Sequence, residues 1–234
     1  MTQSEMIAAL KLITTATLTT VMLKRGVPSS WIAGAAPFSA TDERVVGPAF
    51  TMRFVPSRED LATPDSWKGP HSTRAAIEEM PEGSICVVDT RGITSAGVFG
   101  DILAGRMVKR GIAGIVTDGA MRDGEGVKRT GMPIWCAGAV APASITSLAF
   151  VGWQEPVGCG DTAVFPNDII VADGDGAVVI PKAMLHEVTA AAIEQERLEA
   201  WIVQQVDEGH SLPGLYPPSE ETLARYKHER DGET

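Results

Sequence analysis

The chain has 234 residues, of which 44% are hydrophobic, and its 30 acidic and 20 basic side chains give a formal net charge of −10. This length suits a single α/β domain with a full hydrophobic core. The acidic balance argues against sequence-independent nucleic-acid binding, which needs a basic surface, so we expect no nucleic-acid partner.

The cysteines and the N-terminus narrow the class of protein further. Cys86, Cys136 and Cys159 form no C-x-x-C pair, so they predict neither a zinc site nor a disulfide scaffold. The N-terminal segment lacks the basic region of a signal peptide, and Lys11 interrupts its apolar stretch. No run approaches the roughly 18 apolar residues that span a bilayer. We therefore expect a cytoplasmic protein with no membrane partner.

The first third of the chain is predicted to contain two helices, a strand and a surface loop. Helical spacing of apolar residues predicts one helix over residues 4–24. Residues 44–55 are typical of a strand, and Gly47-Pro48 is expected to split it. The polar segment 57–72 is expected to be a surface loop, and 73–79 a short helix that Pro81 helps to end.

A βαβ unit is predicted around residues 84–117. The continuous apolar run 84–89 indicates a buried strand, a glycine-rich loop follows to Gly100, and 101–110 is helical. Gly111 breaks the helix and 112–117 returns to strand. This order implies parallel strands with a right-handed crossover, and ligands in such sheets bind at the carboxyl ends of strands.

The second half predicts a hairpin and a long helix within the same domain. The D-G-D-G sequence at 173–176 lies between two apolar runs, which favours a turn over a calcium loop. The remaining predictions are a polar segment to 131, strands at 133–137 and 162–165, a long helix at 182–207 and a short charged helix at 219–230. We expect one domain over 1–209 and a tail over 210–234 at a subunit interface.

Three polar side chains are expected at the same edge of the sheet. Asp101 opens the predicted helix, and Arg122-Asp123 follows the next strand. Each has a plainer interpretation, since Arg122-Asp123 could be a solvated turn and Asp101 a residue favoured by the helix dipole. A carboxylate can also ligate Mg²⁺, and a guanidinium can grip a carboxylate. Together they predict a site where a metal acts as Lewis acid on a 2-oxo acid while Arg122 neutralises developing charge.

Four stretches resemble the RraA-like family. They are V-V-G-P-A-F-T at 45–51, Gly100-Asp101-Ile102-Leu103, Asp101 followed after twenty residues by Arg122-Asp123, and D-I-I-V-A-D-G-D-G-A-V-V-I-P at 168–181. The resemblance covers roughly residues 10–210. The family includes regulators of ribonuclease activity and class II 4-hydroxy-4-methyl-2-oxoglutarate/4-carboxy-4-hydroxy-2-oxoadipate aldolases. The Asp-x20-Arg-Asp spacing marks its aldolase-competent members.

The resemblance implies a compact, layered α/β/β fold in homotrimers or homohexamers with sites between subunits. It implies Mg²⁺ or Mn²⁺, or another divalent cation, held by Asp123 and mostly water, with Asp101 positioning the water that shuttles protons. Glu196 or Glu199 of a neighbouring subunit would support the metal waters. The implied substrate-binding residues are Gly100, Asp101, Ile102, Leu103 and Arg122.

One position departs from the family pattern. Many members carry an acidic residue three positions after the aspartate that matches Asp123, whereas this chain has Gly126 there and Glu125 one position earlier. The departure bears on how the metal's waters are held or on substrate preference.

The resemblance and the residues predict a metal-dependent carbon–carbon lyase. It would cleave a 4-hydroxy-2-oxo acid to pyruvate and a carbonyl compound, and the same pyruvate enolate would allow decarboxylation of oxaloacetate. The alternative is a non-enzymatic regulator that binds and inhibits an RNA-processing nuclease. A third possibility is a sugar-acid pathway enzyme that applies the same enolate chemistry to another 2-oxo acid.

Overall fold

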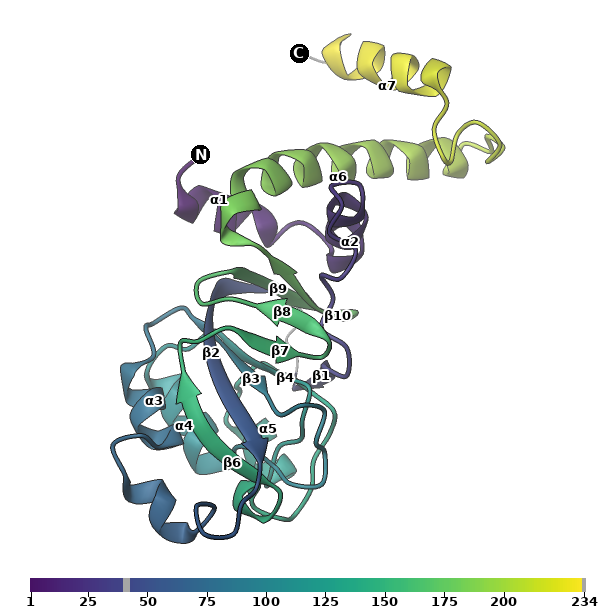
Figure 1. The fold of residues 1–234 in the computed structure, drawn as a ribbon. Coiled ribbons are helices and arrows are strands. Elements are labelled where there is room, and N and C mark those ends of the chain that lie inside the picture. The colour runs from purple at the N-terminus through teal and green to yellow at the C-terminus, as the bar shows by residue number, and fades with distance from the viewer. Residues whose placement is uncertain (40–42, 233–234) are drawn as a thin grey trace.

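The computed structural model describes residues 1–39 and 43–232. A body of strands and short helices lies beneath a layer made by α1, α2 and α6, and α7 lies above α6 (Figure 1). The α-helices are α1 (Gln3–Leu10), α2 (Thr15–Leu23), α3 (Thr73–Glu79), α4 (Asp101–Lys109), α5 (Gly124–Arg129), α6 (Leu185–Asp207) and α7 (Glu220–Gly232). The strands are β1 (Ala36–Ser39), β2 (Val45–Pro56), β3 (Ile85–Asp89), β4 (Gly114–Thr117), β5 (Ile134–Cys136), β6 (Leu148–Trp153), β7 (Val157–Cys159), β8 (Thr162–Val164), β9 (Ile169–Asp173) and β10 (Gly176–Ile180). Short 3₁₀ helices are η1 (Pro64–Lys68), η2 (Ser144–Thr146) and η3 (Lys182–Met184).

The main sheet has the strand order β1-β5-β4-β3-β2-β9-β10, with β6 also paired to β2. Strands β2, β3, β4 and β5 are parallel to one another, whereas β1, β6, β9 and β10 pair antiparallel with their neighbours. The β3–α4–β4 segment is the predicted βαβ unit, and its parallel pairing confirms that prediction. The carboxyl ends of β3 and β4 therefore lie at one edge of the sheet.

Strand β2 continues through Gly47 and Pro48, so the expected split is wrong. Residues Val45 to Pro48 pair with β9, and the pairing with β3 begins at the next residue. The two residues thus mark a change of partner within an unbroken strand. A Cβ at Gly47 would collide with the carbonyl oxygen of Gly83, which explains why glycine occupies this crowded position.

The helix predicted over residues 4–24 is two helices, α1 and α2, and the prediction of one is wrong. Thr14 adopts an extended backbone conformation between them, and its hydroxyl accepts a hydrogen bond from the backbone N–H of Thr17. Threonine caps a helix better than it continues one, so the chain restarts there. The polar segment after Asp123 also contains an unpredicted helix, α5, whose apolar content is too small to show helical periodicity.

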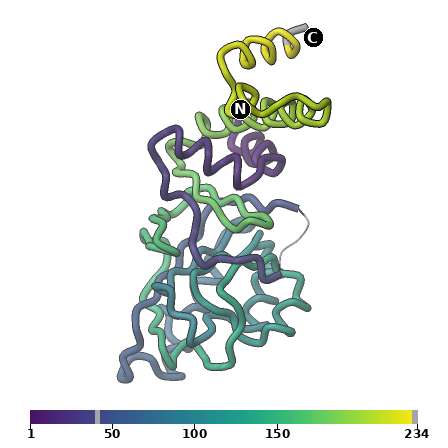
Figure 2. Tube along the Cα trace, turned by 90° about the vertical axis from the view of Figure 1, so that its right-hand side faces the viewer, coloured from purple at the N-terminus to yellow at the C-terminus, as the bar shows by residue number. Residues whose placement is uncertain are grey.

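Three apolar clusters hold the layers together. Helices α3, α4 and α5 pack on one face of the parallel strands, around buried residues such as Phe54, Ile77, Met107 and Val127. The β7–β8 hairpin covers the other face, where Trp135 is buried. A third cluster joins α1, α2 and α6 to β9 and β10. This arrangement confirms the predicted layered α/β fold, and the tube view in Figure 2 shows the helical layer stacked on the body.

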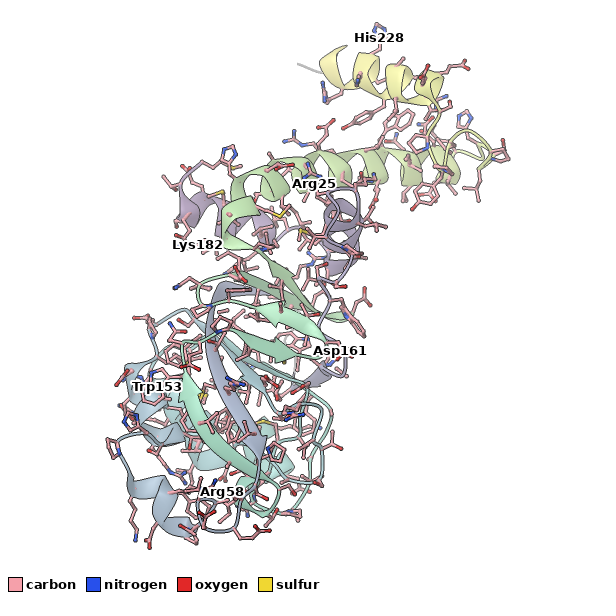
Figure 3. The ribbon with its side chains drawn as sticks, in the orientation of Figure 1. Arg25, Arg58, Trp153, Asp161, Lys182 and His228 are labelled. Atoms are coloured by element: carbon pink, nitrogen blue, oxygen red, sulfur yellow. The ribbon has the colours of Figure 1, made fainter. Side chains whose placement is uncertain are left out.

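Helices α6 and α7 form an arm beyond the body. Side chains of the two helices extend toward each other (Figure 3). The rings of Trp201 and Tyr226 lie 5.6 Å apart, and the Trp201 indole donates to Glu229 at 2.7 Å. The assignment of 210–234 to a subunit interface stays a prediction. Within the described ranges, no single helix is long and apolar enough to cross a membrane, and α1 with α2 meets that test only as a pair bent by 115°.

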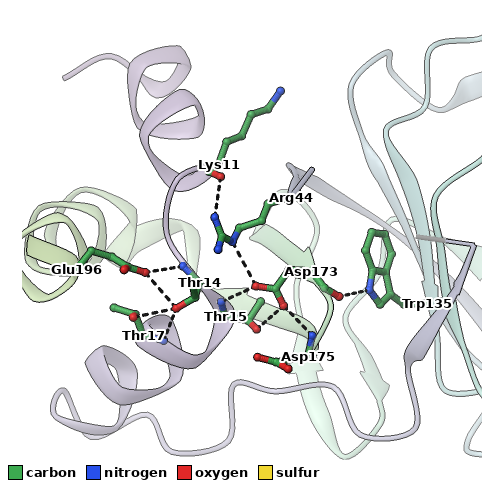
Figure 4. A network of polar contacts seen from close by, with 9 residues as sticks. All are labelled: Lys11, Thr14, Thr15, Thr17, Arg44, Trp135, Asp173, Asp175 and Glu196. Atoms are coloured by element: carbon green, nitrogen blue, oxygen red, sulfur yellow. Dashed lines mark hydrogen bonds and ion pairs between the residues drawn. The ribbon is translucent and has the colours of Figure 1, made fainter. Parts of the chain in front are cut away.

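The D-G-D-G segment is the predicted hairpin turn, and its first aspartate anchors helix α2 (Figure 4). The Asp173 carboxylate accepts hydrogen bonds from the backbone N–H of Thr15 at 2.9 Å and from its hydroxyl at 2.7 Å, and Arg44 lies 3.4 Å away. Burial alone would raise the pKa of Asp173, but the hydrogen bonds from Thr15, the Asp175 backbone and Arg44 together outweigh burial and lower that pKa.

We expect this lowered pKa to make stability depend on acid pH. The stabilisation from the ionised Asp173 is complete above its ordinary pKa, about 4, and is lost as pH falls through the lower pKa of the folded state. The free-energy advantage of wild type over Asp173→Asn, measured by urea unfolding, should therefore shrink between pH 5 and pH 3. The control is Asp65→Asn, because the Asp65 side chain is 85% exposed. A constant advantage over this range would contradict the assignment.

Candidate active site

Two loops at the carboxyl edge of the sheet lie side by side. The loop after β3 is joined to the loop after β4 by hydrogen bonds from Val98 N–H to the Ala120 carbonyl, 2.9 Å, and from Arg122 N–H to the Phe99 carbonyl, 2.8 Å. A Cβ at Gly97 would lie 2.5 Å from Cγ of Arg122, so a glycine is required for this close approach. The pairing brings Arg122 beside the start of α4.

The N-termini of α4 and α5 contact each other reciprocally. Gly100 is the N-cap of α4, and a Cβ there would lie 2.5 Å from Oδ2 of Asp123. Asp123 in turn is the N-cap of α5, and a Cβ at Gly126 in that helix would lie 2.7 Å from Oδ2 of Asp101. Each aspartate thus lies against a glycine of the other helix. The site therefore contains two carboxylates, Asp101 and Asp123, from separate segments of the chain.

Asp123 has a left-handed backbone conformation, with φ of 51° and ψ of 46°. Few residues other than glycine adopt this conformation, although aspartate tolerates it better than most. Such backbone geometry is often found where a side chain must be aimed at a ligand. Among the described residues, neither Asp101 nor Asp123 has a side-chain hydrogen bond or ion pair within the chain.

Arg122 is only partly engaged by the protein. Its Nε donates to the Ala141 carbonyl at 3.1 Å, which holds the side chain over the loop, and its two terminal nitrogens have no hydrogen-bond partner among the described residues. No carboxylate of the described residues forms an ion pair with it. The guanidinium is therefore positioned to bind an anion.

These groups line a cavity of about 310 Å³. All six residues predicted from the sequence to act in catalysis, substrate binding or direct metal binding contribute to it, namely Gly100, Asp101, Ile102, Leu103, Arg122 and Asp123. A neighbouring hollow of about 240 Å³ has no carboxylate in its lining and offers less chemistry. A larger hollow of about 650 Å³ has Asp89 and Asp118 in its lining, but both carboxylates accept hydrogen bonds from backbone N–H groups. The unpaired charges therefore favour the cavity at the α4 N-terminus as the candidate active site.

Three further polar or aromatic side chains of this cavity were not predicted from the sequence: Trp67, Arg74 and Ser144. Trp67 lies in η1 within the segment expected to be a loop, and Arg74 lies in the first turn of α3. Ser144 follows Ala143, which bridges to Gly97. A basic residue in the first turn of a helix is unusual, and that signal could have drawn attention to Arg74.

Glu196 and Glu199 bind the α1–α2 region of their own chain. Glu196 Oε1 accepts from the backbone N–H of Thr14 at 2.7 Å (Figure 4), and Glu199 Oε2 accepts from the Thr17 hydroxyl at 3.2 Å. Neither lines the cavity that contains Asp101 and Asp123. Their proposed support of a neighbouring subunit's site stays a prediction.

The carboxylates can be tested against the requirements of a divalent cation. No group of three or more His, Cys, Asp or Glu side chains suited to a metal occurs among the described residues. Mg²⁺ needs no such cage, since one or two carboxylates with several waters suffice. Asp123 and Asp101 are unpaired carboxylates at one cavity, and this donor set fits a hard, hydrated cation. Cys86 and Cys136 are buried free thiols, and burial raises the pKa of each.

The close approach of Asp101 explains why this chain has a glycine at position 126. A Cβ at that position would also lie 2.9 Å from Cβ of Asp101, so a larger residue must displace Asp101 or separate the two helices. If the site has the lyase function proposed below, we expect Gly126→Asp to lower the rate of pyruvate release about 100-fold, because a misplacement of about 1 Å can have this effect. A coupled pyruvate assay measures the rate, and Gly105→Ala is the control because its Cβ would meet only Thr130 Cγ2 at 3.8 Å. Wild-type activity in Gly126→Asp would contradict the packing argument.

The comparisons with known proteins identify the class. A family model described as RraA-like, Aldolase/RraA, matches residues 15–179, well over half of the chain. The chain therefore belongs to the RraA-like family. It is 34% identical over 156 residues to a Halalkalibacterium halodurans protein named "Putative 4-hydroxy-4-methyl-2-oxoglutarate aldolase", covering 66% of this chain and 68% of that one. It is also 30% identical over 169 residues to protein DlpA of Legionella pneumophila. This match spans only 26% of the length of DlpA.

Solved structures agree with the fold. RraAS2 of Streptomyces coelicolor, described as an unusual member of the RNase ES inhibitor RraA protein family, is similar with a TM-score of 0.76 and 34% identity, covering 85% of this chain and 96% of that one. An uncharacterised protein of Pseudomonas syringae has a TM-score of 0.77 and 25% identity, covering 91% and 97% of the two chains. The predicted RraA-like fold is confirmed.

Proposed function

We propose that this chain is a divalent-metal-dependent lyase that cleaves a 4-hydroxy-2-oxo acid to pyruvate and a carbonyl compound. The observation that carries the proposal is the convergence of Asp101, Arg122 and Asp123 at one cavity. A regulator that acts by surface contact would not need two unpaired carboxylates and an unpaired guanidinium around a hollow. The naming of the Halalkalibacterium halodurans relative supports the same class of reaction.

Substrate binding would use backbone and side chain together. The carboxylate of the pyruvate moiety is negative, and the first turn of α4 presents unpaired N–H groups from Asp101, Ile102 and Leu103 with the positive end of the helix dipole. Arg122 would bind the same moiety and neutralise the charge that develops on its 2-oxo oxygen.

The reaction breaks the C3–C4 bond of the substrate. The C4 hydroxyl loses its proton to a water that Asp101 orients, the electron pair of the bond moves onto the pyruvate moiety as an enolate, and C4 becomes a carbonyl carbon. The enolate then takes one proton at C3 and leaves as pyruvate. Loss of CO₂ from oxaloacetate generates the same enolate, so the site would support decarboxylation too.

A bound Mg²⁺ or Mn²⁺ would supply Lewis-acid stabilisation of the enolate. Asp123 is the residue proposed to hold the cation, because its carboxylate is exposed at the cavity and unpaired in the described part of the chain.

A screen of 2-oxo acids tests the proposal. Purified protein would be offered 4-hydroxy-4-methyl-2-oxoglutarate, oxaloacetate and sugar-derived 4-hydroxy-2-oxo acids, with pyruvate measured by a coupled assay. We expect Mg²⁺- or Mn²⁺-dependent pyruvate release from at least one of them, and its loss on adding a chelator. Absence of release from every substrate with every divalent metal would overturn the proposal.

The likeness to RraAS2 motivates a second candidate function, inhibition of an RNA-processing nuclease. That function would depend on outer surface contacts rather than on the cavity. If it holds, Asp123→Asn should inhibit the nuclease as well as wild type does in an RNA-cleavage assay. If instead the protein leaves cleavage unchanged at every concentration, this alternative is excluded for the nuclease tested.

A further inference from the structure

Arg74 is a second cationic side chain at the proposed catalytic cavity. It enters from α3, whereas Arg122 enters from the loop after β4, and both line the same hollow. The guanidinium carbon of Arg74 lies 4.9 Å from the centre of the Trp67 ring, and Nη1 lies 3.2 Å from the Thr73 hydroxyl. Stacking on tryptophan orients the planar guanidinium and limits its motion.

This cation has no anionic partner among the described residues. Glu78, which lies on the same helix, is bound instead by Arg106 at 2.7 Å and Arg110 at 3.2 Å. Arg74 is half-buried, and burial lowers its pKa with no neighbouring carboxylate to offset the effect. A partly desolvated charge without a counter-ion is costly, and an anionic ligand would relieve that cost.

We propose that Arg74, oriented by Trp67, binds the second carboxylate of a dicarboxylic substrate and so sets substrate choice. This inference rests on the proposed lyase function and deepens it. Arg122 and the α4 N-terminus account for the carboxylate of the pyruvate moiety, which leaves the Arg74 guanidinium for a carboxylate attached at C4. A planar fork of donors matches a carboxylate in bidentate fashion. Substrates whose C4 carries a carboxylate are therefore favoured over those with an uncharged group there.

A matched pair of substrates isolates this contact. One is 4-hydroxy-4-methyl-2-oxoglutarate, and the other is the analogue with a methyl group in place of the C4 carboxylate. The wild-type preference, the ratio of the two kcat/KM values, is compared with that of Arg74→Met and Arg74→Lys. We expect Arg74→Met to lower the preference about 10- to 100-fold, mainly through KM for the dicarboxylate, and Arg74→Lys to restore part of it. Arg129→Met is the control, since the Arg129 side chain is 73% exposed and lies outside the cavity.

A second readout separates the two proposals. Exchange of the pyruvate methyl protons with deuterated water reports enolate formation and involves no second carboxylate. Exchange at the wild-type rate in Arg74→Met, together with a reduced dicarboxylate preference, supports the inference. An unchanged preference with exchange intact overturns the role of Arg74 and leaves the lyase in place. Absence of exchange in wild type overturns the lyase and the role of Arg74 together.

Discussion

Replacing Asp123 with asparagine is expected to lower pyruvate release about 1,000-fold while the fold is retained, since preorganised charges at such sites contribute two to three orders of magnitude. The substitution keeps the size of the side chain and removes its negative charge. Asparagine also tolerates the left-handed backbone conformation that Asp123 adopts. The expected loss therefore reports the charge and not a distorted loop.

The same variant should lose affinity for the divalent cation. Titration calorimetry with Mn²⁺ alone would measure this separately from activity. Glu125→Gln is the matched control, because it removes a carboxylate two residues away whose side chain is 98% exposed. Arg122→Met should lower activity similarly but leave Mn²⁺ affinity near that of wild type. Turnover within tenfold of wild type in Asp123→Asn or Arg122→Met would contradict the assignment of that residue.

The largest effect on stability is expected at Asp118, which is buried beneath the loop that follows β3. Its carboxylate accepts hydrogen bonds from Thr90 N–H and hydroxyl, each at 2.8 Å, from Gly92 N–H at 2.8 Å and from Gly160 N–H at 3.3 Å. One side chain thus ties the loop after β3 to the β7–β8 hairpin. Removing it leaves several buried donors without a partner.

We expect Asp118→Ala to lower the free energy of unfolding by about 3 kcal/mol, measured by urea denaturation at pH 7. Asp118→Asn should also be destabilised, because its amide nitrogen would face an N–H donor of Gly92 or Gly160. Asp175→Ala is the control, since Asp175 is an exposed hairpin residue, and should change stability by no more than about 0.5 kcal/mol. A loss below about 0.5 kcal/mol in Asp118→Ala would show that the network contributes little.

Local patterns in the sequence predicted the elements that position the candidate site. The buried strand β3, the helix that Asp101 opens and the strand before Arg122 follow from apolar runs and glycine breaks, because these are short-range signals. The hairpin at 173–176 follows in the same way from its turn residues. The parallel pairing of β3 and β4 then explains why Asp101 and Arg122, with twenty residues between them, line one cavity.

Long-range contacts account for what could not be predicted. Trp67 lies in a segment with no periodicity and Arg74 in a short predicted helix, and only the packing of α3 beside α4 accounts for their place at the cavity. Helix α5 begins with Gly124 and contains Gly126, residues that lower helix propensity, and contact with Asp101 explains why Gly126 is there. The break at Thr14 depends on its hydrogen bonds to Thr17 and Glu196, the second of which is 182 residues away.

The most direct test of the central claim is the exchange of pyruvate methyl protons in deuterated water, followed by NMR with Mg²⁺ or Mn²⁺ present. It requires only pyruvate, a metal and the side chains of one cavity, so it is independent of the identity of the full substrate. The account predicts exchange well above the protein-free rate in wild type and its loss in Asp123→Asn and Arg122→Met. Exchange no faster than in buffer, or equally fast in the two variants, would contradict it.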